Sequence, residues 1–298
     1  MSATIIDGKK IAEGIKHSLK EEIENLRRRG STPGLAVVLV GQNPASQIYV
    51  SMKNKTAADL GINSRTITLP EATTQMELLQ IVRELNEDRT VHAILIQLPL
   101  PSHIDETMMI NSIAPEKDVD GFHPINRGKL MLGADTFIPC TPLGIQQLLA
   151  ISQIDTDGKH VVIVGRSRIV GLPLANMFIQ KKDGANATVT VCHTGTGDLT
   201  HFTRQADILI AAIGKAEFIK AQMVKEGVVV IDVGVNRLED SKDSKGYRIV
   251  GDVEFAAIAK KASAITPVPG GVGPMTIAML IYNTVKATKE FCASSSTG

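Results

Sequence analysis

The segment VIVGRSRIVGLP, residues 162–173, joins an apolar run of strand character to the beginning of a helix. We expect the strand to end at Gly165, which permits a tight turn, and the helix to begin near Val170, with Gly171 allowing close packing. At such a corner the free backbone N–H groups and the helix dipole point at the same place, so the segment is a candidate phosphate-binding turn. Its spacing departs from G-x-G-x-x-G, because Ser167 replaces the second glycine and the last glycine falls one place late. An ordinary strand-to-helix turn is therefore the alternative interpretation.

The end of the next expected strand, TVTVCHTGTGD at residues 188–198, indicates which nucleotide this turn would bind. A site for NAD favours an acidic residue there, which takes the ribose hydroxyls. Cys192, His193 and Thr194 occupy that place instead, and Arg166 lies in the glycine turn. This combination suits a 2′-phosphate through charge-assisted hydrogen bonds, so NADP is predicted rather than NAD. The alternative is that Arg166 is an ordinary solvated surface residue.

Apolar runs of strand length alternate with segments of helical period on both sides of this turn, a pattern typical of a parallel sheet with crossover helices. Two such units are visible, separated by a turn-rich stretch between about residues 120 and 140. We therefore predict an α/β fold with an N-terminal domain over 1–138 and a second domain over 139–274. The last apolar helix, 275–298, is expected to pack back on the first domain.

Length, composition and charge exclude several classes of protein. The chain has 298 residues, too many for one ordinary core, which favours two domains. Its net charge of +1, its 3% of aromatic residues and the absence of Trp argue against a nucleic-acid partner. Three widely spaced cysteines predict reduced thiols rather than disulfides or a metal site. With no signal peptide and no apolar run of membrane-spanning length, a cytoplasmic protein is expected.

Three shorter segments carry polar side chains that could act on a ligand. In SQIYVSMKNK, Tyr49 and Lys53 are four residues apart and share a helix face, although by themselves they would more simply form a solvated face. In ILIQLPLP, Gln97 ends an apolar strand at the edge where open α/β sheets place their ligands. The third, EKDVDG, could be an ordinary turn, because Asp and Gly are common turn formers.

The segment TPVPGGVGPMT, residues 266–276, combines three glycines with three prolines just before the last apolar helix. Gly270, Gly271 and Gly273 would let the backbone approach a flat ligand or adopt positive φ. The prolines limit the freedom of the loop, and Pro274 can be the first residue of the helix because no N–H is wasted there. A simple helix-entry turn would need fewer special residues.

Taken in order, YVSMK, QLPLP, PEKDVDG, GRSRIVGLP and PGGVGPMT resemble the signatures of the methylenetetrahydrofolate dehydrogenase/cyclohydrolase family, over nearly the whole chain. The resemblance implies a folate-binding N-terminal domain, a Rossmann-type NADP domain with a parallel sheet, and an active cleft between them. It implies oxidation of 5,10-methylenetetrahydrofolate with NADP, hydrolysis of the methenyl product to 10-formyltetrahydrofolate, and a homodimer without a metal. Two departures are small: Thr194 where many members have Ser, and a short insertion, QKKDGANA, at residues 180–187.

The same resemblance assigns site residues. The catalytic residues would be Lys53, Tyr49 and Gln97. Folate would be bound by these three together with Leu98, Asp120, Pro269, Gly270, Gly271, Val272 and Gly273, and NADP by Gly165, Arg166, Ser167, Thr194 and Val235.

Two other classes of protein remain open from the sequence. The chain could be an NADP-dependent dehydrogenase of another small substrate, such as a shikimate-like acid, or an NADP-binding sensor without catalysis. The first would need a cationic or hydroxyl cluster for a carboxylate, and none is as well ordered as Tyr49, Lys53, Gln97 and Asp120. The second would not need a lysine facing its ligand.

Overall fold

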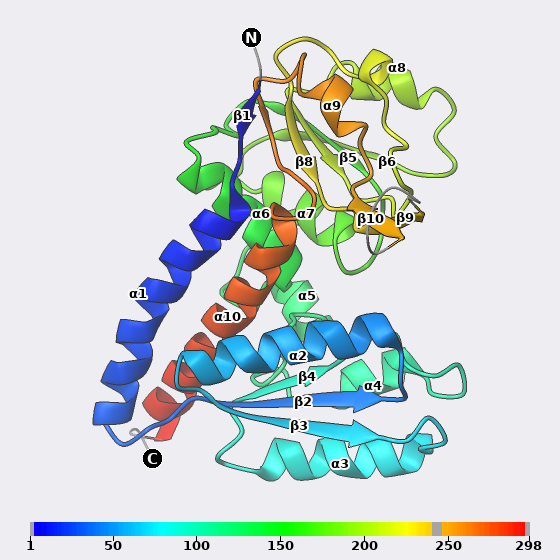
Figure 1. Ribbon diagram of the computed structural model, residues 1–298. Helices are drawn as coiled ribbons and strands as arrows, with labels where there is room; N and C mark the ends of the chain where they lie inside the picture. Colours follow the sequence, from blue (N-terminus) through cyan, green and yellow to red (C-terminus); the bar gives the residue numbers. More distant parts are fainter. Residues whose placement is uncertain (1–2, 240–245, 296–298) are drawn as a thin grey trace. The chain divides into compact units, whose positions relative to one another are not determined.

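The computed structural model describes residues 3–239 and 246–295 and divides into two compact units (Figure 1). One unit comprises residues 1–12 and 141–276, and the other comprises 13–140 and 277–298. We call them the six-stranded unit and the three-stranded unit after their main sheets. Two long helices, α1 (Gly8–Arg28) and α10 (Val272–Ser295), each contribute residues to both units.

The sheet of the six-stranded unit has the strand order β1-β11-β8-β7-β5-β6, and all of its neighbouring strands are parallel. Strands β5 and β7 lie inside the sheet and are almost wholly apolar and buried, as expected where helices cover both faces. Because the strands are parallel, the loops that follow β5, β6, β7 and β8 all leave the same edge. The strands are β1 (Thr4–Ile5), β5 (His160–Val164), β6 (Thr188–Cys192), β7 (Ile208–Ala211), β8 (Val229–Asp232) and β11 (Ala264–Ile265).

Short helices and one hairpin complete this unit. The hairpin pairs β9 (Asn236–Glu239) with β10 (Tyr247–Val250) in antiparallel fashion. The helices are α6 (Cys140–Ile151), α7 (Gly171–Phe178), α8 (Leu199–Thr203), the 3₁₀ helix η1 (Ala221–Met223) and α9 (Phe255–Ile258).

The three-stranded unit has β2 (Gly34–Val40) at the centre of a parallel sheet, between β3 (Asn63–Leu69) and β4 (Ala93–Ile96). Every residue of β2 is buried, and Figure 1 shows α2 (Pro44–Asp59) and α3 (Gln75–Glu87) on opposite sides of the sheet. The α3 side of the core is formed by Ala36, Val38, Val40, Leu78, Val82 and Leu85, together with residues of β4. Two shorter helices, α4 (Glu106–Ser112) and α5 (Pro124–Met131), follow.

The expected α/β class with two domains and a parallel sheet is confirmed. One difference concerns the first residues, which the sequence analysis assigned to the N-terminal domain. Thr4 and Ile5 instead pair with Ala264 and Ile265 of β11, in the six-stranded unit. A second difference is that α10 begins at Val272, so Pro274 is its third residue and not its first. The N–H groups of the first turn have no intrahelical partner, so a proline costs no hydrogen bond at this position either. Within the described residues, no helix is both long enough and apolar enough to cross a membrane.

Candidate functional site

Lys53 and Gln97 meet in the three-stranded unit, where α2 passes the end of β4. The Nζ of Lys53 lies 2.9 Å from the Oε1 of Gln97 and donates a hydrogen bond to it, and the lysine is only 9% exposed. Gln97 follows β4 directly, and its Nε2 donates to the carbonyl oxygen of Leu98 at 2.7 Å. Both ends of the amide are thus engaged, which fixes the oxygen toward the lysine.

Asp120 belongs to the same group of side chains. Its Oδ1 accepts a hydrogen bond from the thiol of Cys140 at 3.5 Å, and that thiol also lies 3.5 Å from the carbonyl oxygen of Val119. Burial raises the pKa of the Asp120 carboxyl, and the charge of Lys53 opposes that rise. Burial, reinforced by the negative charge of Asp120, raises the pKa of the Cys140 thiol well above its usual range. The thiol therefore stays protonated and can donate to the carboxylate.

The loop that carries Asp120 is anchored by two charged residues of the PEKDVDG segment, Lys117 and Asp118. The Nζ of Lys117 donates to the carbonyl oxygens of Leu85, Asn86 and Asp88, at 3.1, 2.7 and 2.9 Å, around the C-terminus of α3. The buried carboxylate of Asp118 accepts from the backbone N–H of His123 and from the Nδ2 of Asn126. EKDVDG is therefore an anchored segment rather than an ordinary exposed turn.

The remaining residues predicted to bind folate include more exposed positions. Tyr49 lies one turn before Lys53 on α2 and is 39% exposed, and Leu98 is half-buried. The loop before α10 belongs to the six-stranded unit, where Gly270 has φ 107° and its carbonyl oxygen accepts from the N–H of Lys9. A side chain at Gly271 would meet the carbonyl oxygen of Pro267 at 2.6 Å, whereas Gly273 has open space around it. Two of the three glycines are thus required by the path of the chain itself.

A cavity of about 580 Å³ opens at the carboxyl edge of the six-stranded sheet, at the predicted phosphate-binding turn. No described residue that lines it is acidic, which favours an anionic ligand. The lining comprises Val164, Gly165, Arg166, Ser167, His193, Thr194, Thr196, Gly197, Leu199, Ala212, Ile213, Lys215 and Phe218. Four of the five residues predicted to bind NADP thus lie together; the fifth, Val235, follows β8 and is 54% exposed.

The two glycines of the turn are required by close backbone approach. A Cβ at Gly165, whose φ is 132°, would lie 2.2 Å from the carbonyl oxygen of Ala212, and one at Gly171 would lie 2.0 Å from that of Gly165. The Oγ of Ser167 accepts a hydrogen bond from the N–H of Val170 at 3.1 Å, just before α7 begins. Arg166 and Thr194 are exposed to the cavity and available to a ligand.

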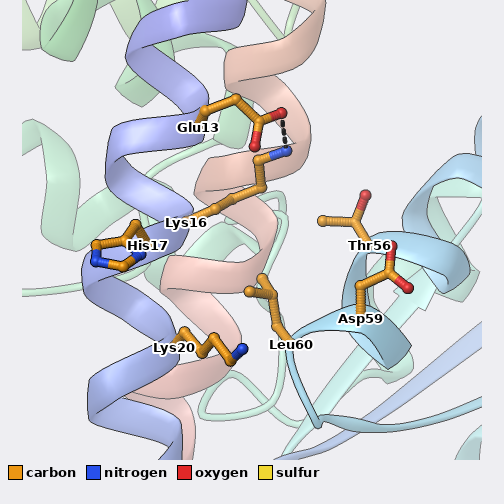
Figure 2. Close-up of a pocket in the computed structure, with 7 residues that line it drawn as sticks. All are labelled: Glu13, Lys16, His17, Lys20, Thr56, Asp59 and Leu60. Carbon is orange, nitrogen blue, oxygen red and sulfur yellow. Dashed lines mark hydrogen bonds and ion pairs between the residues drawn. The ribbon is translucent and has the colours of Figure 1, made fainter.

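A second cavity, of about 380 Å³, lies between α1 and the end of α2 in the three-stranded unit (Figure 2). Its lining combines two lysines, Lys16 and Lys20, with two acids, Glu13 and Asp59, and Lys16 is already paired with Glu13 at 2.7 Å. Because the charges balance, this cavity does not favour a particular class of ligand.

Sequence reasoning missed Cys140, Lys117 and Asp118. Cys140 was treated only as a reduced thiol, and nothing local reveals that it faces an acid twenty residues earlier. Lys117 and Asp118 belong to the PEKDVDG segment, but their hydrogen bonds depend on the tertiary structure. Lys117 reaches the end of α3, and Asp118 accepts from Asn126 in α5.

One unit has a parallel sheet with a glycine turn beside a cavity whose described lining residues include no acid, and the second α/β unit holds a lysine beside a glutamine and an aspartate. These features define a two-domain α/β protein with a candidate nucleotide site at its larger sheet. The family model described as the NAD(P)-binding domain of tetrahydrofolate dehydrogenase/cyclohydrolase matches residues 139–292, and that of its catalytic domain matches residues 6–120. The chain belongs to the tetrahydrofolate dehydrogenase/cyclohydrolase family.

Individual relatives agree over nearly the full length. The Bifunctional protein FolD of Chlorobium chlorochromatii is 56% identical over 286 residues, which cover 95% of this chain and 97% of that protein. The crystal structure of the bifunctional FolD methylenetetrahydrofolate dehydrogenase/cyclohydrolase of Campylobacter jejuni is 52% identical, with a TM-score of 0.92 over 97% of this chain and 99% of that chain. The FolD of Trypanosoma brucei, complexed with NADP cofactor and inhibitor, is 40% identical with a TM-score of 0.92 over 97% and 98%.

Proposed function

We propose that this chain oxidises 5,10-methylenetetrahydrofolate to the methenyl form with NADP and then hydrolyses the product to 10-formyltetrahydrofolate. The observation that carries the proposal is the contact of Lys53 with Gln97 beside Asp120, within the segment that matches the catalytic domain of the family. The proposed substrate-binding set also includes Tyr49, Leu98 and the loop Pro269–Gly273.

The first reaction needs orientation more than acid–base chemistry. When bound, NADP supplies the acceptor for the hydride that leaves the methylene carbon. The neighbouring folate nitrogen gives its lone pair to the forming cation, so the protein has to hold the ring in place. Asp120, whose carboxyl is held by Cys140, is our candidate to accept hydrogen bonds from the amino edge of the pterin. Arg166 and Thr194 are the proposed ligands of the 2′-phosphate.

The second reaction needs a proton carrier. Water attacks the methenyl carbon, and a proton must move as the tetrahedral adduct forms and collapses. Lys53 is our candidate for this transfer, because it is buried and is held by a neutral amide rather than by a carboxylate. Gln97 orients the amine and adds no negative charge beside it.

One experiment tests the proposal against both alternatives. The protein is assayed spectrophotometrically with NADP and methylenetetrahydrofolate, and separately for hydrolysis of methenyltetrahydrofolate without NADP. We expect turnover in both assays, and we expect both rates to survive in the control variant Lys55→Gln, which changes an exposed lysine two residues from Lys53. An NADP-binding sensor would show neither activity. A dehydrogenase of another substrate would bind NADP but leave both folates unchanged.

We also propose that the chain forms a homodimer, as its family resemblance implies, and that it acts in the cytoplasm. Light scattering during size-exclusion chromatography measures the first property, since a dimer has twice the mass of the 31.9 kDa chain. Fractionation of cells that produce the protein measures the second.

A further inference from the structure

Two buried carboxylates at the ligand edge of the six-stranded sheet take no part in the proposed reactions. Asp232 ends β8 and is 2% exposed, and Asp252 follows β10 and is fully buried. Buried acids are rare unless strong hydrogen bonds compensate for the loss of water. These two must therefore have partners, and their partners indicate what they do.

Asp252 accepts four hydrogen bonds, three from the loop after β7 and one from the first residue of β9. Its Oδ2 accepts from the backbone N–H groups of Ile213 at 2.6 Å and Gly214 at 3.0 Å. Its Oδ1 accepts from the N–H of Lys215 at 3.0 Å and from the Nδ2 of Asn236 at 2.9 Å. An ionised carboxylate suits four donors because both of its oxygens only accept, whereas an amide would turn N–H groups of its own toward two of them.

Asp232 in turn fixes the backbone on which Asp252 stands. Its Oδ1 accepts from the N–H of Asp252 at 2.8 Å and of Gly234 at 3.1 Å, and its Oδ2 accepts from the N–H of Val253 at 3.0 Å. The fit is close, since a Cβ at Gly234 would lie 2.1 Å from the Oδ1 of Asp252. The side chain of Asp252 is thus held through its own backbone, through the loop after β7 and through the start of β9.

The segment Ile213–Lys215, whose three N–H groups point at Asp252, follows β7 and supplies two of the residues that line the 580 Å³ cavity, Ile213 and Lys215. We infer that Asp252 is a positioning residue that holds Ile213–Lys215 in the shape of the cavity wall and so sets the affinity for NADP. The inference rests on the proposed function, because it takes this cavity as the NADP site.

The test is the change of Asp252 to its isosteric amide. In Asp252→Asn we expect the Kd for NADP to rise at least about tenfold, since two of the four donors lose their acceptor. Hydrolysis of methenyltetrahydrofolate, measured without NADP, should stay within about twofold of the wild-type rate, which shows that the protein is folded. Glu254→Gln makes the same chemical change two residues away, at a side chain 40% exposed, and should leave the Kd unchanged.

Arg166→Ala is titrated in parallel to separate the two proposals. If Arg166→Ala weakens NADP binding and Asp252→Asn does not, the positioning role is wrong while the NADP site stands. If neither variant changes the Kd, the cavity is not the NADP site and the inference falls with it.

If the Asp252→Asn variant also loses the hydrolysis of methenyltetrahydrofolate, hydrogen exchange on the wild-type protein tests whether Asp252 holds residues 213–215. Without NADP, the amides of residues 213, 214 and 215 should exchange slowly, because Asp252 already holds them. Exchange at the rate of an open loop would overturn the inference.

Discussion

The Nζ of Lys53 donates a hydrogen bond to the Oε1 of the neutral side chain of Gln97 at 2.9 Å. The nearby acid, Asp120, accepts a hydrogen bond from the thiol of Cys140 instead. A carboxylate as the direct partner would keep the lysine charged and unable to accept a proton. At the scale of single residues, the direct partner of Lys53 is therefore a neutral amide that adds no negative charge beside the amine.

Lys53→Gln should separate the two activities. Glutamine keeps hydrogen bonding but cannot titrate, so hydrolysis of methenyltetrahydrofolate should fall by about 10² to 10⁴, the usual contribution of a proton carrier. The dehydrogenase rate should fall less, through misplacement of the shared ring. Both rates are measured on one preparation, and equal losses would make Lys53 a residue that only positions the substrate.

Arg166→Ala should discriminate between the two nucleotides. Loss of a hydrogen bond to a charged group costs roughly 1.5 to 3 kcal/mol, so NADP binding should weaken about 10- to 100-fold. NAD lacks the 2′-phosphate and should be affected much less. Titration with both nucleotides measures this, and equal losses would contradict the assignment of Arg166 to the 2′-phosphate.

Asp232 should give the protein a pH dependence of stability opposite to that of a salt-bridged acid. Burial, with a contribution from the charge of Asp252, raises the pKa of its carboxyl to about 6, whereas an unfolded aspartate titrates near about 3.9. Between these values the folded state binds the proton more readily, so the stability contributed by this group is lost as the pH rises through about 6.

The comparison with Asp232→Asn isolates this group. The free energy of unfolding of the wild type, relative to that of the variant, should fall by roughly 1 kcal/mol from pH 5 to pH 7. Denaturant titrations at both pH values measure the difference. A constant difference would show that Asp232 does not titrate in this range.

At the scale of elements, the glycines of the loop before α10 differ in how much space surrounds them. A methyl group at Gly271 would collide with backbone, so Gly271→Ala should destabilise the protein by about 1 to 3 kcal/mol. Gly273 has open space around it, so Gly273→Ala should leave the free energy of unfolding within about 0.5 kcal/mol of wild type. If the loop contacts folate, Gly273→Ala should still raise the KM for folate. An unchanged KM would place Gly273 away from the substrate.

The elements that sequence reasoning predicted are those with a local signal. Apolar periodicity and glycine spacing predicted a strand end at Gly165 and a helix start near Val170, each within one residue of the observed ends at Val164 and Gly171. Both glycines prove to be sterically required. Strand β1 was missed because two residues carry no detectable alternation. The role of Asp252 was missed because its donors come from the loop after β7 and from β9, which only the tertiary structure brings together.

At the scale of the whole molecule, the first residues of the chain stabilise a unit built mainly from its second half. Ile6 is 3% exposed and its N–H donates to the carbonyl oxygen of Ile265, while the preceding Ile5 is 47% exposed. Ile6→Ala should therefore lower the free energy of unfolding by about 2 to 5 kcal/mol, and Ile5→Ala should lower it much less. Thermal unfolding monitored with and without NADP measures both variants. Equal effects would mean that the buried contact of Ile6 contributes little.

The pairing of β1 with β11 also bears on how the protein is made. Ala264 is synthesised 260 residues after its partner Thr4, and the residues of α10 that complete the three-stranded unit follow Ala264. At roughly 5 to 20 residues per second, the N-terminal strand waits on the order of 10 to 50 seconds for its neighbour. Strand β1 therefore stays without its partner in the nascent chain until Ala264 and Ile265 have been made.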